Sequence, residues 1–385
     1  MTSAEPIYFN GRFLLQNLTG VQRFAREIVV HLDRQIKDDP WASAQRWVLL
    51  TPPSTVEQLP LERFEQRPVG SGGGHLWEQT SLAYTARNGL LVGLANAGPV
   101  LHPRQLVVMH DAAVFRLPEN YSWAYRLVHQ SLSRRLGRSA TLATVSNFSR
   151  GELAEILKCD PAAMTVVANA VAHERCAEPD PATLARLGLQ DGGYFLVVGS
   201  NSRNKNIGAA VRSFQKAGLP DHQLVIVGDV KASVFGASTE FGGRGVIATG
   251  RLTDAELGAL YRSATALVFP SLYEGFGIPP LEAMAHDCPV LASDIPPVRE
   301  VCGLAAEYFQ PLEEDDLTAL LQRRAQNPGV RRTWQELGRA RAAHFTWSAS
   351  ARTLMTLVQE MSMRRPRSLF WRAFRKPAPT FRNAL

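Results

Sequence analysis

The sequence has no long hydrophobic run and only a few cysteines. No apolar stretch in its 385 residues approaches the roughly 18 residues that a membrane-spanning helix requires. Its first residues include no basic segment followed by an apolar one, so we expect no secretory signal. Neither CxxC nor metal-ligand spacing occurs among the cysteines, which are Cys159, Cys176, Cys288 and Cys302. Free thiols in a reducing cytoplasm are therefore favoured over disulfides.

Positive charge is concentrated at one end of the chain. The formal net charge is +7, but residues 362–385 hold seven Lys and Arg residues and no Asp or Glu, so the rest is neutral. A neutral body argues against a nucleic-acid-binding protein, which would carry a basic face on its folded part. Rings and arginines alternate in this tail at Phe370, Trp371, Arg372, Phe374 and Arg375. The mixture suits contact of 364–382 with the anionic inner face of the cytoplasmic membrane, and a disordered solubilising tail explains it equally well.

Apolar runs alternate with helical patterns along the whole chain, which predicts an α/β fold with parallel sheets. We expect strands at 47–50, 105–110, 141–146, 194–200, 223–228, 245–250 and 266–270. We expect helices at 19–35, 207–218 and 253–264. Residues 174–193 are rich in Pro, Gly and acids, which is typical of a linker. We therefore predict two Rossmann-like domains facing each other across a cleft, at 1–180 and 181–345. No GxGxxG follows the first strand, which argues against a dehydrogenase.

A polar loop with two cations follows the expected strand at 194–200. In doubly wound sheets ligands bind at the carboxyl ends of strands, where backbone amides and a helix N-terminus favour anions. Arg203 and Lys205 could hold a diphosphate there. A solvated basic loop accounts for the same residues.

The stretch SLYEGFGIPPLEAM, residues 271–284, places two glutamates after another strand. Because Pro280 suits the first turn of a helix, we place Glu274 in the loop and Glu282 in the first helical turn. Gly275 and Gly277 have no side chains, so the backbone amides of this loop can approach a ligand closely. The helix dipole alone would explain a carboxylate at Glu282, but it does not explain Glu274 or the glycines.

A weaker candidate follows the strand at 245–250. Thr253 and Glu256 have the spacing of a capping box, which explains both structurally. A nucleobase-binding role for Thr249, Gly250 and Arg251 rests only on their position at the end of a strand.

The extended segment SLYEGFGIPPLEAMAHDCPVLASDIPPVREVCG resembles the signature of the retaining family 4 glycosyltransferases of the GT-B fold, which carry two glutamates separated by seven residues. Supporting blocks lie at 19–28, 75–82 (HLWEQTSL), 107–115, 144–153, 199–207 and 345–354, so the resemblance spans about residues 8 to 360. It implies a helix at 346–360 that packs back on the first domain, with 361–385 as the basic tail.

The resemblance also implies roles for individual residues. Glu282 would bind ribose hydroxyls, and Glu274 would hold hydroxyls of the donor sugar. The remaining donor-binding residues would be Gly20, Arg203, Lys205, Gly275, Phe276 and Gly277. His110 would contact the sugar near the reacting carbon, and Asp111 is a weak candidate for assisting the acceptor. The family often has Arg-Lys-Asn where this chain has Asn204-Lys205-Asn206, so either Arg203 substitutes for the arginine or Lys205 acts largely alone.

These residues together predict a glycosyltransferase. The family favours mannose, with GDP-mannose as donor, and implies retention and a lipid-linked saccharide acceptor at a cytoplasmic membrane. Asp-x-Asp, the metal-holding pair of the other main glycosyltransferase fold, is absent from the sequence, so we expect no metal and no other cofactor. The alternatives are an epimerase or hydrolase of the same fold and a non-catalytic partner subunit, including one that binds RNA through its tail.

Overall fold

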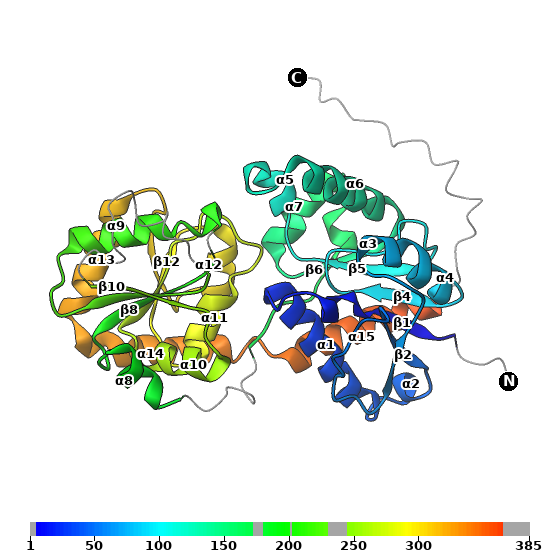
Figure 1. Cartoon of the computed structure of the whole chain (residues 1–385), viewed down its shortest axis with the longest axis horizontal. Helices are drawn as coiled ribbons and strands as arrows, with labels where there is room; N and C mark the ends of the chain where they lie inside the picture. Colours follow the sequence, from blue (N-terminus) through cyan, green and yellow to red (C-terminus); the bar gives the residue numbers. More distant parts are fainter. Residues whose placement is uncertain (1–4, 172–179, 201, 230–244, 365–385) are drawn as a thin grey trace, which may run out of the picture.

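The computed structural model describes residues 5–171, 180–200, 202–229 and 245–364, arranged as two α/β domains (Figure 1). All strand pairs in both sheets are parallel. The loops that carry Asp111, Lys205 and Glu274 therefore lie at the carboxyl ends of parallel strands, as the Rossmann-like prediction requires.

The first domain is built on a seven-stranded sheet in the order β3-β2-β1-β4-β5-β6-β7. Its strands are β1 (Ile7–Asn10), β2 (Trp47–Thr51), β3 (Phe64–Pro68), β4 (Leu90–Gly93), β5 (Gln105–Met109), β6 (Thr141–Thr144) and β7 (Thr165–Val166). Its α-helices are α1 (Gly20–Ile36), α2 (Pro40–Ser43), α3 (Gly74–Trp77), α4 (Ala83–Ala86), α5 (Ala113–Arg116), α6 (Trp123–Ser139) and α7 (Asn147–Leu157). Shorter turns are the 3₁₀-helices η1 (Gly11–Leu15), η3 (Pro118–Asn120) and η4 (Pro161–Ala163), and the π-helical turn η2 (Glu78–Leu82).

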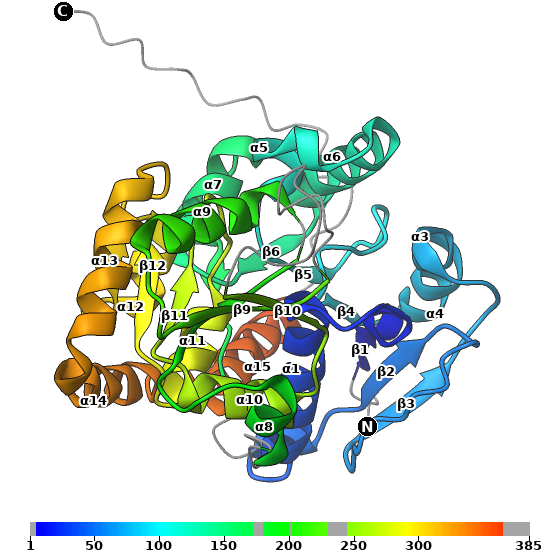
Figure 2. The ribbon, with the colours of Figure 1, turned by 60° about the vertical axis from the view of Figure 1, so that its left-hand side comes forward.

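The second domain has a six-stranded sheet in the order β10-β9-β8-β11-β12-β13. Its strands are β8 (Tyr194–Val198), β9 (Gln223–Val227), β10 (Val246–Gly250), β11 (Ala266–Phe269), β12 (Val290–Ser293) and β13 (Glu307–Phe309). Its helices are α8 (Ala182–Leu187), α9 (Ile207–Ala217), α10 (Asp254–Ser263), α11 (Ile278–Ala285), α12 (Pro296–Cys302), α13 (Glu314–Gln326) and α14 (Arg331–Ala342), with 3₁₀ turns η5 (Arg203–Lys205) and η7 (Pro328–Val330). Figure 2 shows helices on both sides of this sheet, which explains why its strands are hydrophobic throughout.

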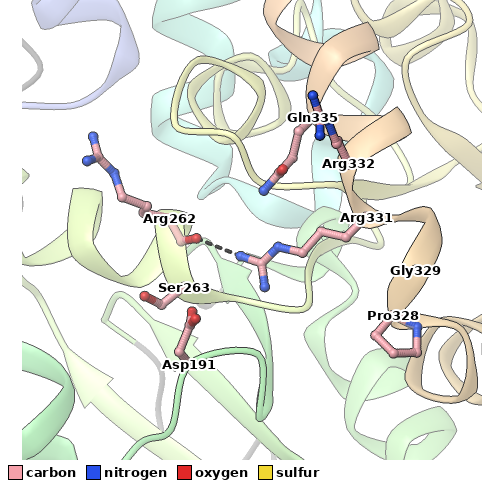
Figure 3. Close-up of a pocket in the computed structure, with 8 residues that line it drawn as sticks. All are labelled: Asp191, Arg262, Ser263, Pro328, Gly329, Arg331, Arg332 and Gln335. Atoms are coloured by element: carbon pink, nitrogen blue, oxygen red, sulfur yellow. Dashed lines mark hydrogen bonds between the residues drawn. The ribbon is translucent and has the colours of Figure 1, made fainter.

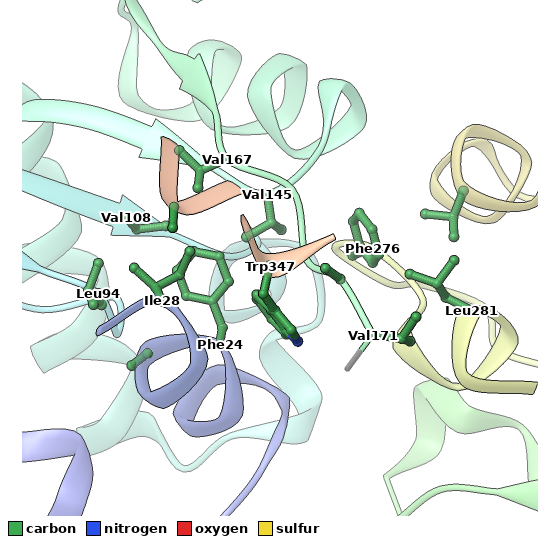
Figure 4. Packing of buried hydrophobic residues seen from close by; sticks show 14 of the residues in the cluster. Phe24, Ile28, Leu94, Val108, Val145, Val167, Val171, Phe276, Leu281 and Trp347 are labelled. Carbon is green, nitrogen blue, oxygen red and sulfur yellow. The ribbon is translucent and has the colours of Figure 1, made fainter. Parts of the chain in front are cut away.

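The last described helix, α15 (Trp347–Met363), returns to the first domain and packs against α1. One apolar cluster runs through this junction (Figure 4). Trp347 lies 5.8 Å from Phe24 of α1, measured between ring centroids, and Phe276 meets Phe345 edge-on at 5.7 Å. The hydrophobic core is therefore continuous from one domain into the other.

Several local expectations can be compared with the structure. The predicted strands and helices are present, with ends shifted by at most three residues. The linker interpretation of 174–193 is wrong in part, because α8 occupies residues 182–187 within it. The predicted domain boundary at 180 adjoins residues 172–179, which lie outside the described residues. The predicted basic tail beyond Arg364 also lies outside them. Within the described part of the chain, no helix has the length and apolarity needed to cross a membrane.

Candidate active site

The carboxyl ends of three strands of the second sheet and the η3 turn of the first domain line an open pocket of about 480 Å³. It is lined by Glu119, Asn120, Ser200, Ser202, Arg203, Asp229 and Arg251. The Asn120 amide lies within hydrogen-bond distance of Ser202 Oγ (3.4 Å) and Asn204 Oδ1 (3.3 Å), so both domains contribute to one pocket. This matches the position at which doubly wound folds bind their ligands.

The two loops that carry the predicted donor-binding residues are joined by hydrogen bonds. Lys205 Nζ lies 2.7 Å from Glu274 Oε1, and both side chains are largely buried. The Leu272 N–H donates to Asn204 O (2.7 Å), and the Asn204 amide donates to the carbonyl of Tyr273 (3.0 Å). The loops after β8 and β11 thus fix a cation beside a carboxylate. Sequence analysis placed Lys205 and Glu274 in loops after strands but did not predict that they pair.

Asp111 completes this charge cluster from the first domain. Burial raises the pKa of Asp111, and the negative charge of Glu274 raises it further. The hydrogen bond from the Ala113 N–H and the charge of Lys205 act in the opposite direction. Sequence analysis treated Asp111 as a weak candidate for assisting the acceptor, whereas the structure places it close enough to Glu274 and Lys205 for both charges to shift its pKa.

His110 lies in the same region but is 5% exposed. Burial lowers the pKa of His110 to about 4, so its imidazole is neutral at neutral pH. Its Nε2 lies 2.9 Å from Leu94 O, and its ring meets Phe24 edge-on at 4.8 Å. Because Nε2 must donate to that carbonyl, Nδ1 is the nitrogen left to accept a hydrogen bond.

Gly275 lies directly against the backbone of the first domain. A Cβ at this position would overlap His110 O and lie 2.8 Å from Asp111 Cβ. The Gly275 carbonyl accepts from Ser146 Oγ (2.6 Å), and Ser149 Oγ lies 2.9 Å from the carbonyls of both Gly275 and His110. The glycine is therefore required by domain packing, and the donor-binding role of its amide stays a prediction.

The other residues of this loop have distinct structural roles. Gly277 has φ +106°, which a side chain would oppose, and it precedes the first turn of α11. Phe276 is buried in the core between the domains, so only its backbone could contact a ligand. Donor contacts from these two amides also remain predictions.

Gly20 begins α1 and lies against the second domain. A Cβ at Gly20 would lie 2.8 Å from Ile278 Cδ1, and Ile278 is the first residue of α11. Two helix N-termini are thus brought together, and each carries unpaired N–H groups and a partial positive charge. An anionic group bound between them would be stabilised by both helices.

Glu282 lies in the second turn of α11, which corrects the prediction of the first turn. Its Oε2 accepts a hydrogen bond from Tyr261 Oη (3.2 Å). Burial raises the pKa of Glu282, while the nearby positive charge of Arg23 lowers it. Arg23 also pairs with Asp254 of the second domain at 2.8 Å. Sequence analysis did not single out Arg23, although it lies three residues after Gly20 in a helix expected at the site.

The arginines predicted for the phosphates and the nucleobase line one pocket. Arg203 and Arg251 are both exposed there, and neither has an ion-pair partner within the described ranges. Thr249 Oγ1 donates to Gly250 O (3.0 Å), so this hydroxyl is already used within its own turn. The capping box of Thr253 and Glu256 is confirmed.

Two further features lie outside this group. A second pocket of about 560 Å³ between α10 and α14 contains none of the predicted site residues (Figure 3). Its lining is Asp191, Arg262, Ser263, Pro328, Gly329, Arg331, Arg332 and Gln335. Over the residues that the structure covers, no group of three or more His, Cys, Asp or Glu side chains could hold a metal ion.

Comparison with known proteins agrees with this architecture. Residues 184–341 match the model of the glycosyl transferases group 1. The second domain belongs to this family. The predicted resemblance to glycosyltransferases is confirmed, whereas the retaining outcome and the residue roles stay predictions.

Three similar proteins extend the comparison over the rest of the chain. O-antigen chain mannosyltransferase B of Escherichia coli is 26% identical over 373 residues, which cover 86% of this chain and 93% of that protein. O-antigen chain mannosyltransferase RfbU of Salmonella typhimurium is 28% identical over 230 residues, which cover 58% of this chain and 62% of that protein. The structure of HepE from Anabaena in complex with UDP and glucose superposes with a TM-score of 0.67 at 16% identity, covering 92% of this chain and 99% of that one. The predicted GT-B fold is confirmed.

Proposed function

We propose that this chain is a retaining glycosyltransferase that moves a hexose, with mannose favoured, from a nucleotide-diphosphate sugar to a bacterial surface polysaccharide or lipopolysaccharide. The observation that carries the proposal is the Lys205–Glu274 pair, held between two strand ends and facing Asp111. A diphosphate needs a cation, and the sugar attached to it offers hydroxyls to a carboxylate. The names of the two O-antigen mannosyltransferases support the choice of mannose and of a polymer acceptor.

The donor is assigned to residues by their positions. Its diphosphate would lie near Lys205 and Arg203, with the N-termini of α1 and α11 contributing at Gly20 and Ile278. Glu282 would accept hydrogen bonds from the ribose, and Glu274 from the sugar. We favour GDP-mannose, whose base would lie near the turn of Thr249, Gly250 and Arg251.

The chemistry is stabilisation of charge by groups that are already in place. When the bond from the anomeric carbon to the diphosphate breaks, negative charge grows on the leaving group and positive charge on the sugar. Lys205 and Arg203 would stabilise the first, and the carboxylate of Glu274 would stabilise the second. These side chains could stabilise both developing charges without a metal ion, so we propose that transfer is independent of metal. Neutral His110 would accept a hydrogen bond from a sugar hydroxyl. Retention rests on the family resemblance alone.

The proposed acceptor and the proposed location of the protein have less support than the donor assignment. A lipid-linked saccharide fits the acceptors of surface polysaccharide assembly, and the basic aromatic segment 364–382 would hold the enzyme at the inner face of the cytoplasmic membrane. Nearly all of that segment lies outside the described residues, so its support is the sequence alone.

The first test is a thermal-shift screen across nucleotide sugars, followed by analysis of products with donor alone and with saccharide acceptors. A transferase forms glycoside only with an acceptor and retains that activity in EDTA. An epimerase or hydrolase converts donor without one, and a non-catalytic partner does neither.

The second test uses variants with a matched control. We expect Glu282→Ala mainly to weaken donor binding and Glu274→Ala mainly to lower turnover. Glu336→Ala, on the exposed face of α14, should behave as the parent. Unchanged calorimetric affinity and unchanged turnover in the first two variants would refute the assignment.

A further inference from the structure

The N-terminus of α7 lies between two loops that hold predicted reacting groups. We call its residues Ser146, Asn147, Phe148 and Ser149 the α7 junction. Ser146 and Ser149 are 0% and 1% exposed, so their polar groups have no access to water. Buried polar groups need partners within the protein. The partners of the α7 junction come from both domains.

The two serine hydroxyls bind backbone carbonyls of both loops. Ser146 Oγ donates to the carbonyl of Gly275 at 2.6 Å, one residue beyond Glu274. Ser149 Oγ lies 2.9 Å from the same carbonyl and 2.9 Å from the carbonyl of His110. A single helix end therefore ties the loop of His110 in the first domain to the loop of Glu274 in the second.

The ring of Phe148 extends this contact to the other side of Glu274. It meets the ring of Tyr273 at 5.9 Å between centroids, with the two planes inclined at 65°. Glu274 is thus flanked by two residues that the α7 junction contacts, Tyr273 before it and Gly275 after it. The position of the Glu274 carboxylate therefore depends on the placement of α7.

A carboxylate of the second domain binds the α7 N-terminus directly. Glu300 of α12 accepts from the backbone N–H groups of Asn147 (2.7 Å) and Phe148 (2.9 Å), and from the Asn147 side-chain amide (2.9 Å). The first N–H groups of a helix have no partner within it, and the helix dipole favours a negative charge beside them. Ser146 caps the N–H of Ser149 from within the first domain (2.9 Å). Glu300 supplies acceptors for the two N–H groups before it.

Glu300 is itself anchored within the second domain. Arg341 of α14 donates to the carbonyls of Glu300 (2.5 Å) and Val301 (2.7 Å), at the end of α12. The Arg341 guanidinium also lies over the ring of Phe345, 5.0 Å from its centroid. Phe345 packs against the apolar cluster that joins the domains. The Glu300 carboxylate is therefore presented to α7 from a fixed position.

We propose that Glu300 is a positioning residue for glycosyl transfer. By binding the α7 N-terminus, it sets His110 and Asp111 of the first domain against the Glu274 loop of the second. In the part of the chain that the structure describes, its carboxylate bonds only to Asn147 and Phe148, so its effect passes through α7. The inference rests on the proposed function, since the reaction that Glu300 serves is the proposed transfer.

Donor binding should depend much less on Glu300. Lys205 still pairs with Glu274 within the second domain when Glu300 is removed, and the Asn204 amide still donates to the carbonyl of Tyr273. The groups assigned to the donor thus keep their contacts with one another. What changes is their alignment with His110 and Asp111, which affects turnover.

A purely structural role, in which Glu300 only stabilises a helix end, is the alternative. The first domain offers a matched control for it. Asp39 is also a half-buried carboxylate, and it accepts from the Ala42 N–H (2.8 Å) at the start of α2. This bond joins two residues of the same domain, so Asp39→Ala removes a helix cap without touching the contact between the domains.

The first measurement is transfer kinetics on the full chain, with donor affinity from calorimetry. Glu300→Ala should lower kcat about tenfold, a part of the roughly 10²-fold that a misplacement of about 1 Å costs, and should leave donor affinity unchanged. Glu300→Gln should recover most of kcat, because its amide oxygen still accepts from one of the two N–H groups. Asp39→Ala should lower the melting temperature as Glu300→Ala does, but should keep the parental kcat.

The second measurement is hydrogen exchange followed by mass spectrometry, which does not depend on activity. Glu300→Ala should exchange faster than the parent in peptides that cover 107–113 and 271–277, because both loops lose a fixed neighbour. Asp39→Ala should exchange there as the parent does.

The proposal is overturned by a parental kcat in Glu300→Ala, by an equal loss of kcat in Asp39→Ala, or by a loss of donor affinity in place of kcat. Unchanged exchange of both loops in Glu300→Ala overturns it as well. If the parent transfers no sugar to any acceptor, the proposed function fails instead, and the exchange measurement still decides whether Glu300 positions these loops.

Discussion

Replacing Gly275 by Ala is expected to disable the enzyme by separating its domains. The added Cβ would lie 2.8 Å from Asp111 Cβ and still closer to His110 O, whereas ordinary contacts are 3.4–4 Å. Relief of both overlaps requires the loop to move by about 1 Å, and a misplacement of that size costs about 10²-fold in rate. Since a slight separation of the domains would relieve the overlap, the loss of stability should stay within the usual 1–3 kcal/mol or so of overpacking.

The assay is kcat/KM for glycosyl transfer, with circular dichroism to follow thermal unfolding. Gly151→Ala is the matched control, because Gly151 lies in neighbouring α7 and an added Cβ there would meet no atom within 4 Å. We expect about 10²-fold loss of kcat/KM in Gly275→Ala and none in the control. Parental activity in Gly275→Ala would mean that the catalytic state does not contain this contact.

Other predictions concern single charges. Lys205→Met should lower kcat about 10²- to 10³-fold in transfer assays, because it removes a preorganised donor to the leaving group; a parental rate would exclude this role. Folding lowers the pKa of His110 from 6.5 to about 4, because its burial favours the neutral imidazole. The free energy of unfolding should therefore be about 3 kcal/mol higher above pH 6.5 than at low pH, and this difference is lost as the pH falls towards 4. Urea unfolding of His110→Gln should show a shallower decline over that range, and an identical pH slope would contradict the burial argument. Because the pKa of Glu282 is raised, the affinity for donor should weaken on acidification before ordinary carboxylates protonate, and calorimetry should find this dependence absent in Glu282→Gln.

The sequence predicted the parallel α/β architecture because hydrophobic strands covered on both faces leave a clear signal. It also placed Glu274 and Lys205 correctly at strand ends, since parallel strands bring successive loops to one edge. It did not reveal α8, whose single buried residue is Thr183, because a short helix rich in surface positions leaves little periodicity.

Features that depend on the contact between domains could not be predicted. The glycine at 275 looks the same in sequence whether it admits a ligand or another backbone, and only the structure shows His110 O beside it. Arg23 lies one helical turn from Gly20, but its importance depends on the approach of Glu282 from the other domain.

The contacts that join the domains involve the same loops that carry the predicted donor-binding groups. Ser146 caps α7 and also donates to the Gly275 carbonyl. The carboxylate of Glu300 accepts from the N–H groups of Asn147 (2.7 Å) and Phe148 (2.9 Å), so α12 of the second domain supplies the negative charge that the α7 N-terminus favours. Opening the domains would break these bonds and move Asp111 away from its charged partners in the same step. The charge cluster of Asp111, Lys205 and Glu274 can therefore form only when the domains are closed, and the same contacts that stabilise closure position the residues that we propose act on the donor.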